Sequence, residues 1–128
     1  LSRDGILREL EMAQAALDRA VGRHYKMRFF RPPGMAGFTS GNGDPYIRAA
    51  IFEKGLSVAL WDVDTFYDAI RHGWGEEEVV RVVANNAQNG SIVLQHFTPA
   101  DIYALDSILN WVESQGLRPT TVSELLKV

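Results

Sequence analysis

The segment Ser91–His96, SIVLQH, decides the fold class, because it is a short apolar strand between clear boundary signals. Asn89 and Gly90 form a turn before it, and the pair Thr98–Pro99 opens a helix directly after it. A strand that is apolar throughout is expected where helices cover both faces of a parallel sheet. This segment therefore predicts an α/β fold.

The rest of the chain alternates helices and strands in the same way. Four strands are predicted, at Met27–Phe30, Leu56–Val63, Ser91–Gln95 and Arg118–Val122. Helical segments of ten or more residues separate them, and such connections join parallel strands through right-handed crossovers. The order predicts one domain over residues 1–128 with no internal boundary. Two architectures fit it, a doubly wound sheet and an arc of a β/α barrel.

Composition excludes several classes of protein. The 128 residues are 46% hydrophobic and 23% charged, which is typical of a folded globular chain. The net charge of −3 and the absence of a basic run give no basis for nucleic-acid binding. No apolar stretch approaches the ~20 residues of a membrane span. Without cysteine, a disulfide framework and a thiolate zinc site are excluded.

Ionisable residues stand at the ends of three successive predicted strands. Arg31 ends the first strand, where Pro32 holds it in an extended conformation. Asp62 and Asp64 end the second strand, and His96 ends the third. In parallel α/β folds, ligands meet the carboxyl ends of the strands. A cation, a carboxylate and an imidazole at one rim are the parts of an acid–base site. Each of these residues taken alone is also what an ordinary strand end contains.

Four motifs in this order resemble the polysaccharide deacetylase family, of the carbohydrate esterase family 4 type. They are FFRPPG at 29–34, WDVDT at 61–65, GSIVLQH at 90–96 and a closing stretch that ends in TVSELL at 121–126. The resemblance implies a distorted β/α barrel and a metal-dependent hydrolase that removes N- or O-acetyl groups from chitin-like sugars, peptidoglycan or xylan. The resemblance also implies that the protein is extracellular or located at the cell surface. This chain is expected to be the C-terminal half of that catalytic domain.

The family pattern implies a role for each matching residue. Arg31 matches the arginine that orients a catalytic aspartate, and the backbone N–H of Gly34 matches an oxyanion donor. Leu94 matches a wall of the pocket for the acetyl methyl group. His96 matches the general acid that protonates the leaving amine or alcohol. Asp64 lies in the segment that carries the family's further carboxylate.

Two positions after Asp64 depart from the family pattern. Tyr67 stands where a carboxylate partner of the histidine is expected, and Asp68 stands where tryptophan is expected. Asp64 and Asp68 therefore both remain candidates for that partner. Outside the motifs, Trp74 lies on a glycine-flanked loop and is a candidate for stacking on a sugar ring.

The metal-binding segments of the family do not occur in this chain. The resemblance places the catalytic base in a Thr-Phe-Asp-Asp segment and two metal ligands in a His-Ser-x-x-His segment, and neither is present. Zinc or another divalent metal is thus expected for the complete domain and none for this chain alone. We expect the N-terminal half on another chain, or a homo-oligomer, to pair with the strand Met27–Phe30.

Two functions from different classes follow. The first is the C-terminal part of a hydrolase acting on acetylated polysaccharide, inactive as an isolated chain. The alternative is a non-catalytic module that retains the deacetylase-like surface for carbohydrate binding or assembly. The polysaccharide itself, and the choice between N- and O-deacetylation, stay open.

Overall fold

The computed structural model describes residues 2–38, 44–66 and 72–127. The chain divides into two compact units, Leu1–Leu60 and Trp61–Val128. Each unit contains a pair of short parallel strands and a pair of packed helices. We call them the first unit and the second unit and describe each by itself. The single domain without an internal boundary stays a prediction.

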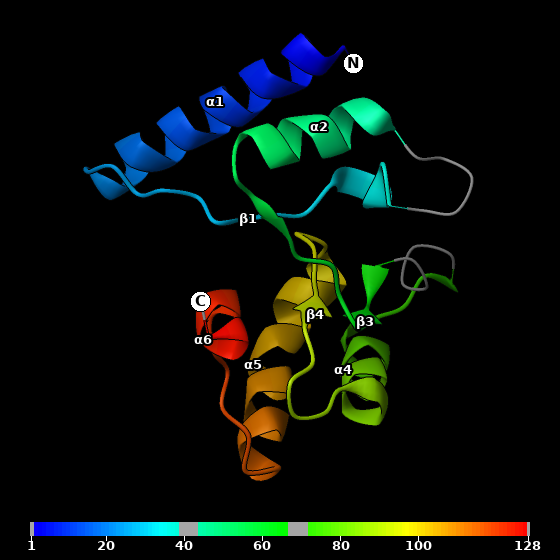
Figure 1. Ribbon diagram of the computed structural model, residues 1–128. Coiled ribbons are helices and arrows are strands. Elements are labelled where there is room, and N and C mark those ends of the chain that lie inside the picture. The colour runs from blue at the N-terminus through cyan, green and yellow to red at the C-terminus, as the bar shows by residue number, and fades with distance from the viewer. Residues whose placement is uncertain (1, 39–43, 67–71, 128) are drawn as a thin grey trace. The chain divides into compact units, whose positions relative to one another are not determined.

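The first unit is built from helices α1 and α2 beside strands β1 and β2 (Figure 1). Its elements are α1 (Arg3–Val21), β1 (Phe29–Phe30), the 3₁₀ turn η1 (Pro33–Met35), α2 (Pro45–Glu53) and β2 (Ser57–Val58). The Ser2 hydroxyl accepts the N–H of Gly5 and caps α1. The buried side chains of Ile6, Leu10 and Ala50 form the core between the two helices.

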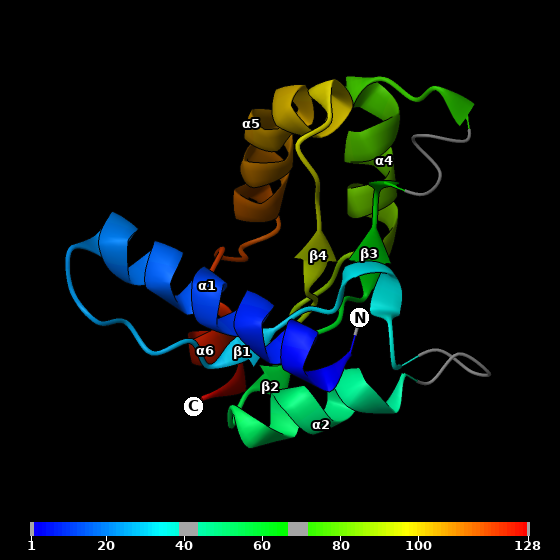
Figure 2. The ribbon, with the colours of Figure 1, turned by 90° about the horizontal axis from the view of Figure 1, so that it is seen from above.

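The second unit repeats this arrangement with helices α4 and α5 side by side (Figure 2). Its elements are β3 (Val63–Asp64), α4 (Glu76–Asn86), β4 (Val93–Leu94), α5 (Pro99–Ser114) and α6 (Val122–Leu126). The fully or almost fully buried residues of its core are Val79, Val83, Ala104 and Ile108, and the strand residue Val93 packs against them. The core thus lies under β4 and leaves the strand ends at its margin.

Both strand pairs are parallel, which confirms the predicted direction of pairing. Phe29 lies opposite Ser57 in the first unit, and Asp64 lies opposite Leu94 in the second. The prediction of four strands in one sheet is wrong for the described residues, which form two two-stranded sheets. The coarser prediction, a mixed helical chain with parallel strands, is confirmed.

The predicted strands Met27–Phe30 and Ser91–Gln95 are observed in shorter form as β1 and β4, and the other two differ more strongly, each for a local cause. The predicted strand Leu56–Val63 is split, because Ala59 donates its N–H to Phe30 while Asp62 donates its N–H to Ile92. The chain therefore changes its hydrogen-bonding partner between these two residues.

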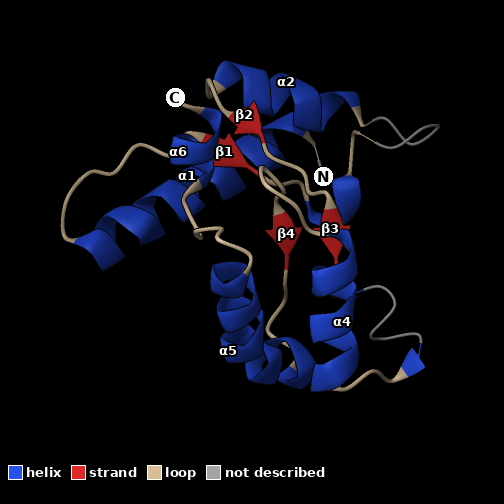
Figure 3. Cartoon of the chain, turned by 90° about the horizontal axis from the view of Figure 1, so that it is seen from below, coloured by secondary structure: helices blue, strands red, loops and turns tan. Residues whose placement is uncertain are grey.

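The second difference is at Arg118–Val122, which Figure 3 shows as loop running into α6. Pro119 has no N–H for a ladder. The Thr121 hydroxyl accepts the N–H of Glu124 at 3.2 Å, so this segment caps α6 instead of forming a strand. Over the described ranges, no helix has both the length and the apolar character needed to cross a bilayer.

Candidate active site

The second unit brings three of the predicted site residues to one edge of its strand pair. Asp64 is the last residue of β3 and lies opposite Leu94, the last residue of β4. Because the two strands are parallel, their carboxyl ends meet at the same edge. His96 follows two residues after Leu94 and is half-buried. Asp64, Leu94 and His96 therefore belong to the same edge of this unit, while their roles stay a prediction.

Phe66 connects the two sides of this edge. Its ring centroid lies 4.1 Å from that of the His96 imidazole, with the planes tilted by 44°. Its backbone N–H donates to Asp64 Oδ1 at 2.9 Å. The Phe66 ring thus limits the movement of the imidazole on one side. The backbone N–H of the same residue holds the Asp64 carboxylate.

A buried carboxylate that sequence reasoning missed lies below the same edge. The side chain of Asp101, in the first turn of α5, accepts hydrogen bonds from the Thr65 hydroxyl at 2.5 Å and from the Thr98 hydroxyl at 2.8 Å. It also accepts the backbone N–H of His96 at 3.2 Å. Asp101 is 2% exposed and Thr65 is fully buried. The spacing Thr98-x-x-Asp101, a helix-start pattern, is the signal in the sequence that could have located it.

Asp62, the other acidic residue of the WDVDT motif, has a structural role. Its Oδ2 accepts the N–H of Ile92 at 2.7 Å, and its own N–H donates to the Ile92 carbonyl at 2.9 Å. These two bonds join the segment before β3 to the segment before β4. They set the register that places Asp64 opposite Leu94.

Arg31 and Gly34 lie in the first unit, directly after β1. Two backbone hydrogen bonds form the turn that follows the strand. The N–H of Met35 donates to the Pro32 carbonyl at 3.1 Å, and the N–H of Ala36 donates to the Pro33 carbonyl at 3.2 Å. Gly34 has φ +59° and ψ 25°, a left-handed conformation that favours glycine. Arg31 is exposed before this stiff turn. A common rim of Arg31 with Asp64 and His96 stays a prediction.

Trp74 lies in the loop before α4 and is half-buried. Its ring stacks on that of His72, with centroids 5.8 Å apart and planes at 24°. Gly73, with φ +62°, makes the turn between the two rings. The role of Trp74 in a sugar subsite stays a prediction. Tyr67 and Asp68 lie outside the described residues.

The described residues do not supply a metal site. Within the ranges 2–38, 44–66 and 72–127, no three side chains of the types histidine, aspartate and glutamate are grouped so that they could hold a metal ion. The donor set of this part of the chain therefore does not fit the divalent metal that the family resemblance implies.

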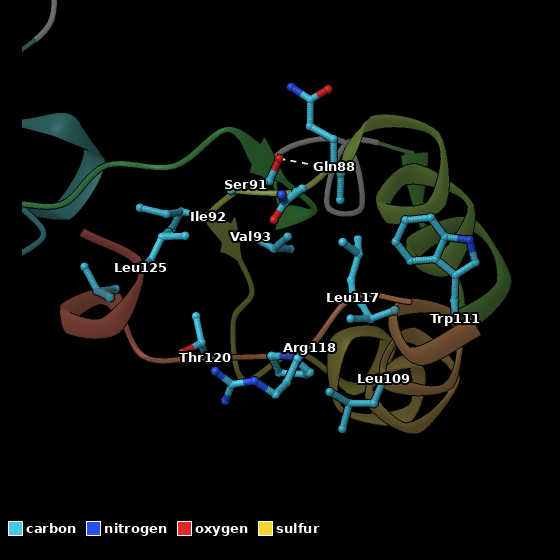
Figure 4. A pocket seen from close by; sticks show the side chains of 16 residues that line it. Gln88, Ser91, Ile92, Val93, Leu109, Trp111, Leu117, Arg118, Thr120 and Leu125 are labelled. Atoms are coloured by element: carbon cyan, nitrogen blue, oxygen red, sulfur yellow. Dashed lines mark hydrogen bonds between the residues drawn. The ribbon is translucent and has the colours of Figure 1, made fainter. Parts of the chain in front are cut away.

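A pocket of about 360 Å³ lies elsewhere in the second unit (Figure 4). Its walls are largely apolar and include Ile92, Val93 and Trp111, while Arg118 and Thr120 lie across from Ile92 and Val93. The pocket thus separates β4 from the segment that was predicted to be the fourth strand. Asp64 and His96 are not among the described residues that line it.

Comparison with known proteins gives the class of the chain. No family model matches it. It is 36% identical over 109 residues to a peptidoglycan-N-acetylglucosamine deacetylase of Bacillus cereus, a match that covers 77% of this chain and 45% of that protein. It is 38% identical over 66 residues to chitin deacetylase 1 of Saccharomyces cerevisiae, covering 52% of this chain and 19% of that protein. The chain thus spans less than half the length of these curated relatives.

Solved structures extend the similarity over nearly the whole chain. The peptidoglycan deacetylase PdaC from Bacillus subtilis is matched with a TM-score of 0.78 at 26% identity, over 99% of this chain and 56% of that chain. A wild-type CE4 family pseudoenzyme from Bacillus anthracis is matched with a TM-score of 0.76 at 27% identity, over 98% of this chain and 41% of that chain.

These matches define the chain as a homologue of polysaccharide deacetylases. More particularly, its structural neighbours are deacetylases and pseudoenzymes of the CE4 family, or carbohydrate esterase family 4. The resemblance carried by the FFRPPG, WDVDT and GSIVLQH motifs is therefore confirmed.

Proposed function

We propose that this chain is the acetyl-binding and proton-donating part of a deacetylase that acts on N- or O-acetylated polysaccharide. Its strands would then form an arc of the distorted β/α barrel of the family. The observation that supports this proposal most strongly is the edge of the second unit, where Asp64, Leu94 and His96 end two adjacent parallel strands. The named activities of the relatives support the substrate class.

In this proposal, His96 is the general acid. An amine or sugar alkoxide is a poor leaving group, and a protonated imidazole can give it a proton as the bond to the acetyl carbon breaks. The ring contact with Phe66 keeps the imidazole in one orientation. Asp64 or Asp68 is the carboxylate partner of this histidine, and Leu94 provides an apolar wall for the acetyl methyl group.

The first unit contributes two further groups to the proposed reaction. The guanidinium of Arg31 can hold a carboxylate in one geometry through paired donors. The N–H of Gly34 is the proposed donor to the oxyanion of the tetrahedral intermediate. The left-handed conformation of Gly34 is a reason for glycine at this position.

The base and the divalent metal of the reaction are assigned to a part of the protein other than the described residues, since these hold no suitable cluster. We propose that an N-terminal portion like that of the longer relatives completes the domain.

A specific observation also favours the alternative function. One of the solved structures that this chain matches is a CE4 family pseudoenzyme, with a TM-score of 0.76. A chain of this fold can therefore be non-catalytic, and the alternative is a module that binds carbohydrate or assembles with a partner.

A chimera separates the two functions. The part of the Bacillus cereus deacetylase that matches this chain is replaced by residues 1–128, and acetate release from N-acetylglucosamine oligomers is measured. The hydrolase proposal predicts acetate release that a metal chelator removes and added zinc restores. The unmodified Bacillus cereus enzyme is the control.

A folded chimera that binds the oligomers but releases no acetate would contradict the hydrolase proposal and support the non-catalytic alternative. A folded chimera that does neither would contradict both. The isolated chain, in equilibrium dialysis with zinc alone, is expected to retain no tightly bound ion.

A further inference from the structure

We propose that Asp101 is a positioning residue that holds the ends of β3 and β4, and with them Asp64 and His96, in one arrangement. The inference rests on the proposed function, because it is the roles of Asp64 and His96 that give this arrangement its importance. Asp101 lies outside the motifs of the resemblance and is not a candidate for contact with substrate, since it is 2% exposed.

On the β4 side, Asp101 fixes the backbone of the proposed general acid. Its Oδ2 accepts the N–H of His96 at 3.2 Å and the Thr98 hydroxyl at 2.8 Å. The Thr98 hydroxyl oxygen in turn accepts the N–H of Asp101 at 3.1 Å. One carboxylate oxygen therefore joins the residue that leaves the strand to the residue that opens α5.

On the β3 side, the other oxygen reaches across to the neighbouring strand end. Oδ1 of Asp101 accepts the hydroxyl of Thr65 at 2.5 Å. Thr65 directly follows Asp64, and its N–H points to the Leu94 carbonyl at 3.5 Å. The same carboxylate thus holds the backbone on both sides of the strand pair.

A simple helix cap does not account for this network. Capping of α5 is achieved by Thr98, which accepts the N–H of Asp101 within the first turn. The contacts of Asp101 with Thr65 and with the His96 amide lie outside that turn and join two other elements. Burying a carboxylate is costly unless several donors satisfy it, and here three donors do so.

This arrangement has a chemical consequence. A general acid works only when its proton lies within hydrogen-bond reach of the leaving atom, and small displacements lower the rate strongly. Asp101 restrains the backbone from which the His96 side chain projects. Phe66 restrains the ring, so the backbone and the imidazole are held by separate contacts.

The test uses the full chain and needs no enzymatic activity. Backbone amide hydrogen exchange is followed by NMR in the wild type, in Asp101→Asn and in the matched control Asp18→Asn, which changes an aspartate of the first unit. In Asp101→Asn, exchange at the His96 amide should become about tenfold faster, the change expected for the loss of one hydrogen bond to a charged acceptor. Asp18→Asn should leave the His96 amide unchanged.

The amide of Asp64 separates positioning from capping. In Asp101→Asn, the amide signals of Asp64 and Thr65 should shift together with that of His96. A residue that only caps α5 would change the first turn of α5 and leave Asp64 and Thr65 unaltered. That second pattern, or an unchanged His96 exchange rate in a folded Asp101→Asn chain, would overturn the inference.

Thr65→Val keeps the inference testable if Asp101→Asn does not fold. This variant removes only the hydroxyl that bridges to β3, and the conservative variant Thr65→Ser restores it. Signals of Asp64 should move in Thr65→Val and return toward the wild type in Thr65→Ser. Identical Asp64 and His96 signals in both variants and the wild type would contradict the inference, whatever the result of the chimera experiment for the deacetylase function.

Discussion

Asp18 in the first unit and Asp101 in the second each accept hydrogen bonds from a backbone segment outside their own helix, but Asp18 holds the start of one strand and Asp101 the end of another. In the first unit, Asp18 near the end of α1 accepts the N–H of Tyr25 at 3.0 Å and lies 2.8 Å from His24 Nδ1. The side-chain oxygen of Gln14, one helical turn before Asp18, accepts the N–H of Met27 at 3.0 Å. These contacts hold the chain just before β1.

In the second unit, the contacts of Asp101 hold the chain just after β4. Asp18 is half-buried, whereas Asp101 is buried. Ligands of parallel α/β folds meet the carboxyl ends of strands, so only the second network lies at an end where chemistry is expected. The comparison indicates that the network of the first unit supports the fold and that of the second supports the proposed site.

The largest effect is expected for Asp101→Ala. The substitution leaves three donors without their acceptor in a buried place, and we expect it to lower the free energy of unfolding by about 3 kcal/mol. Trp61, Trp74 and Trp111 all lie in the second unit, so tryptophan fluorescence during urea unfolding measures it. An unfolding curve equal to that of the wild type would show that the network adds no stability.

A smaller effect is expected from the matched core variants Ile108→Val and Ile6→Val. Both side chains are almost fully buried, at 5% and 7% exposure, in the cores of the second and first unit. Removing one methylene group should cost about 1 kcal/mol in each case. Ile108→Val is measured by tryptophan fluorescence, and Ile6→Val by hydrogen exchange of the amides in α1. A cost near zero at Ile108 would contradict the assignment of the core below β4.

The smallest effect is expected for Asp18, and it depends on pH. The N–H of Tyr25, and then the hydrogen bond with His24, hold the pKa of Asp18 below its usual range. A carboxyl whose pKa is lowered by folding stabilises the folded state above its unfolded pKa, near 4, and this contribution is lost as the pH falls through the folded value.

Hydrogen exchange of the Tyr25 amide measures this contribution. Wild type should be better protected than Asp18→Asn at pH 6, and the difference should shrink as the pH is lowered toward 3. A difference that grows toward low pH would contradict the sign of the shift. In Asp101→Asn the protection of Tyr25 should be unchanged.

Much of the fold could be predicted from local signals. The helix start at Thr98–Pro99 and the turn of prolines after β1 follow from backbone chemistry, and parallel pairing follows from the helical connections. The prediction of a strand at Arg118–Val122 was wrong. The sequence contains a signal for a helix start there, the capping box Thr121-x-x-Glu124.

The site was predictable only in part. Spacing placed Asp64 and His96 at adjacent strand ends, because alternation and parallel pairing determine where strands end. The Asp101 network could not be inferred in the same way. Its members Thr65, His96 and Asp101 are up to 36 residues apart, and no local pattern shows that two hydroxyls and an amide turn toward one carboxylate.

The proposed role of His96 is the central claim, and one pair of variants tests it most directly. In the chimera with the Bacillus cereus enzyme, His96→Ala should lower deacetylation of N-acetylglucosamine oligomers about 100-fold or more, the usual contribution of a general acid. The rate on an aryl acetate, whose leaving group needs no proton, should fall far less. His72→Ala should leave both rates nearly unchanged. If His96→Ala deacetylates the oligomers at the rate of the unsubstituted chimera, or lowers both rates equally, His96 is not the general acid.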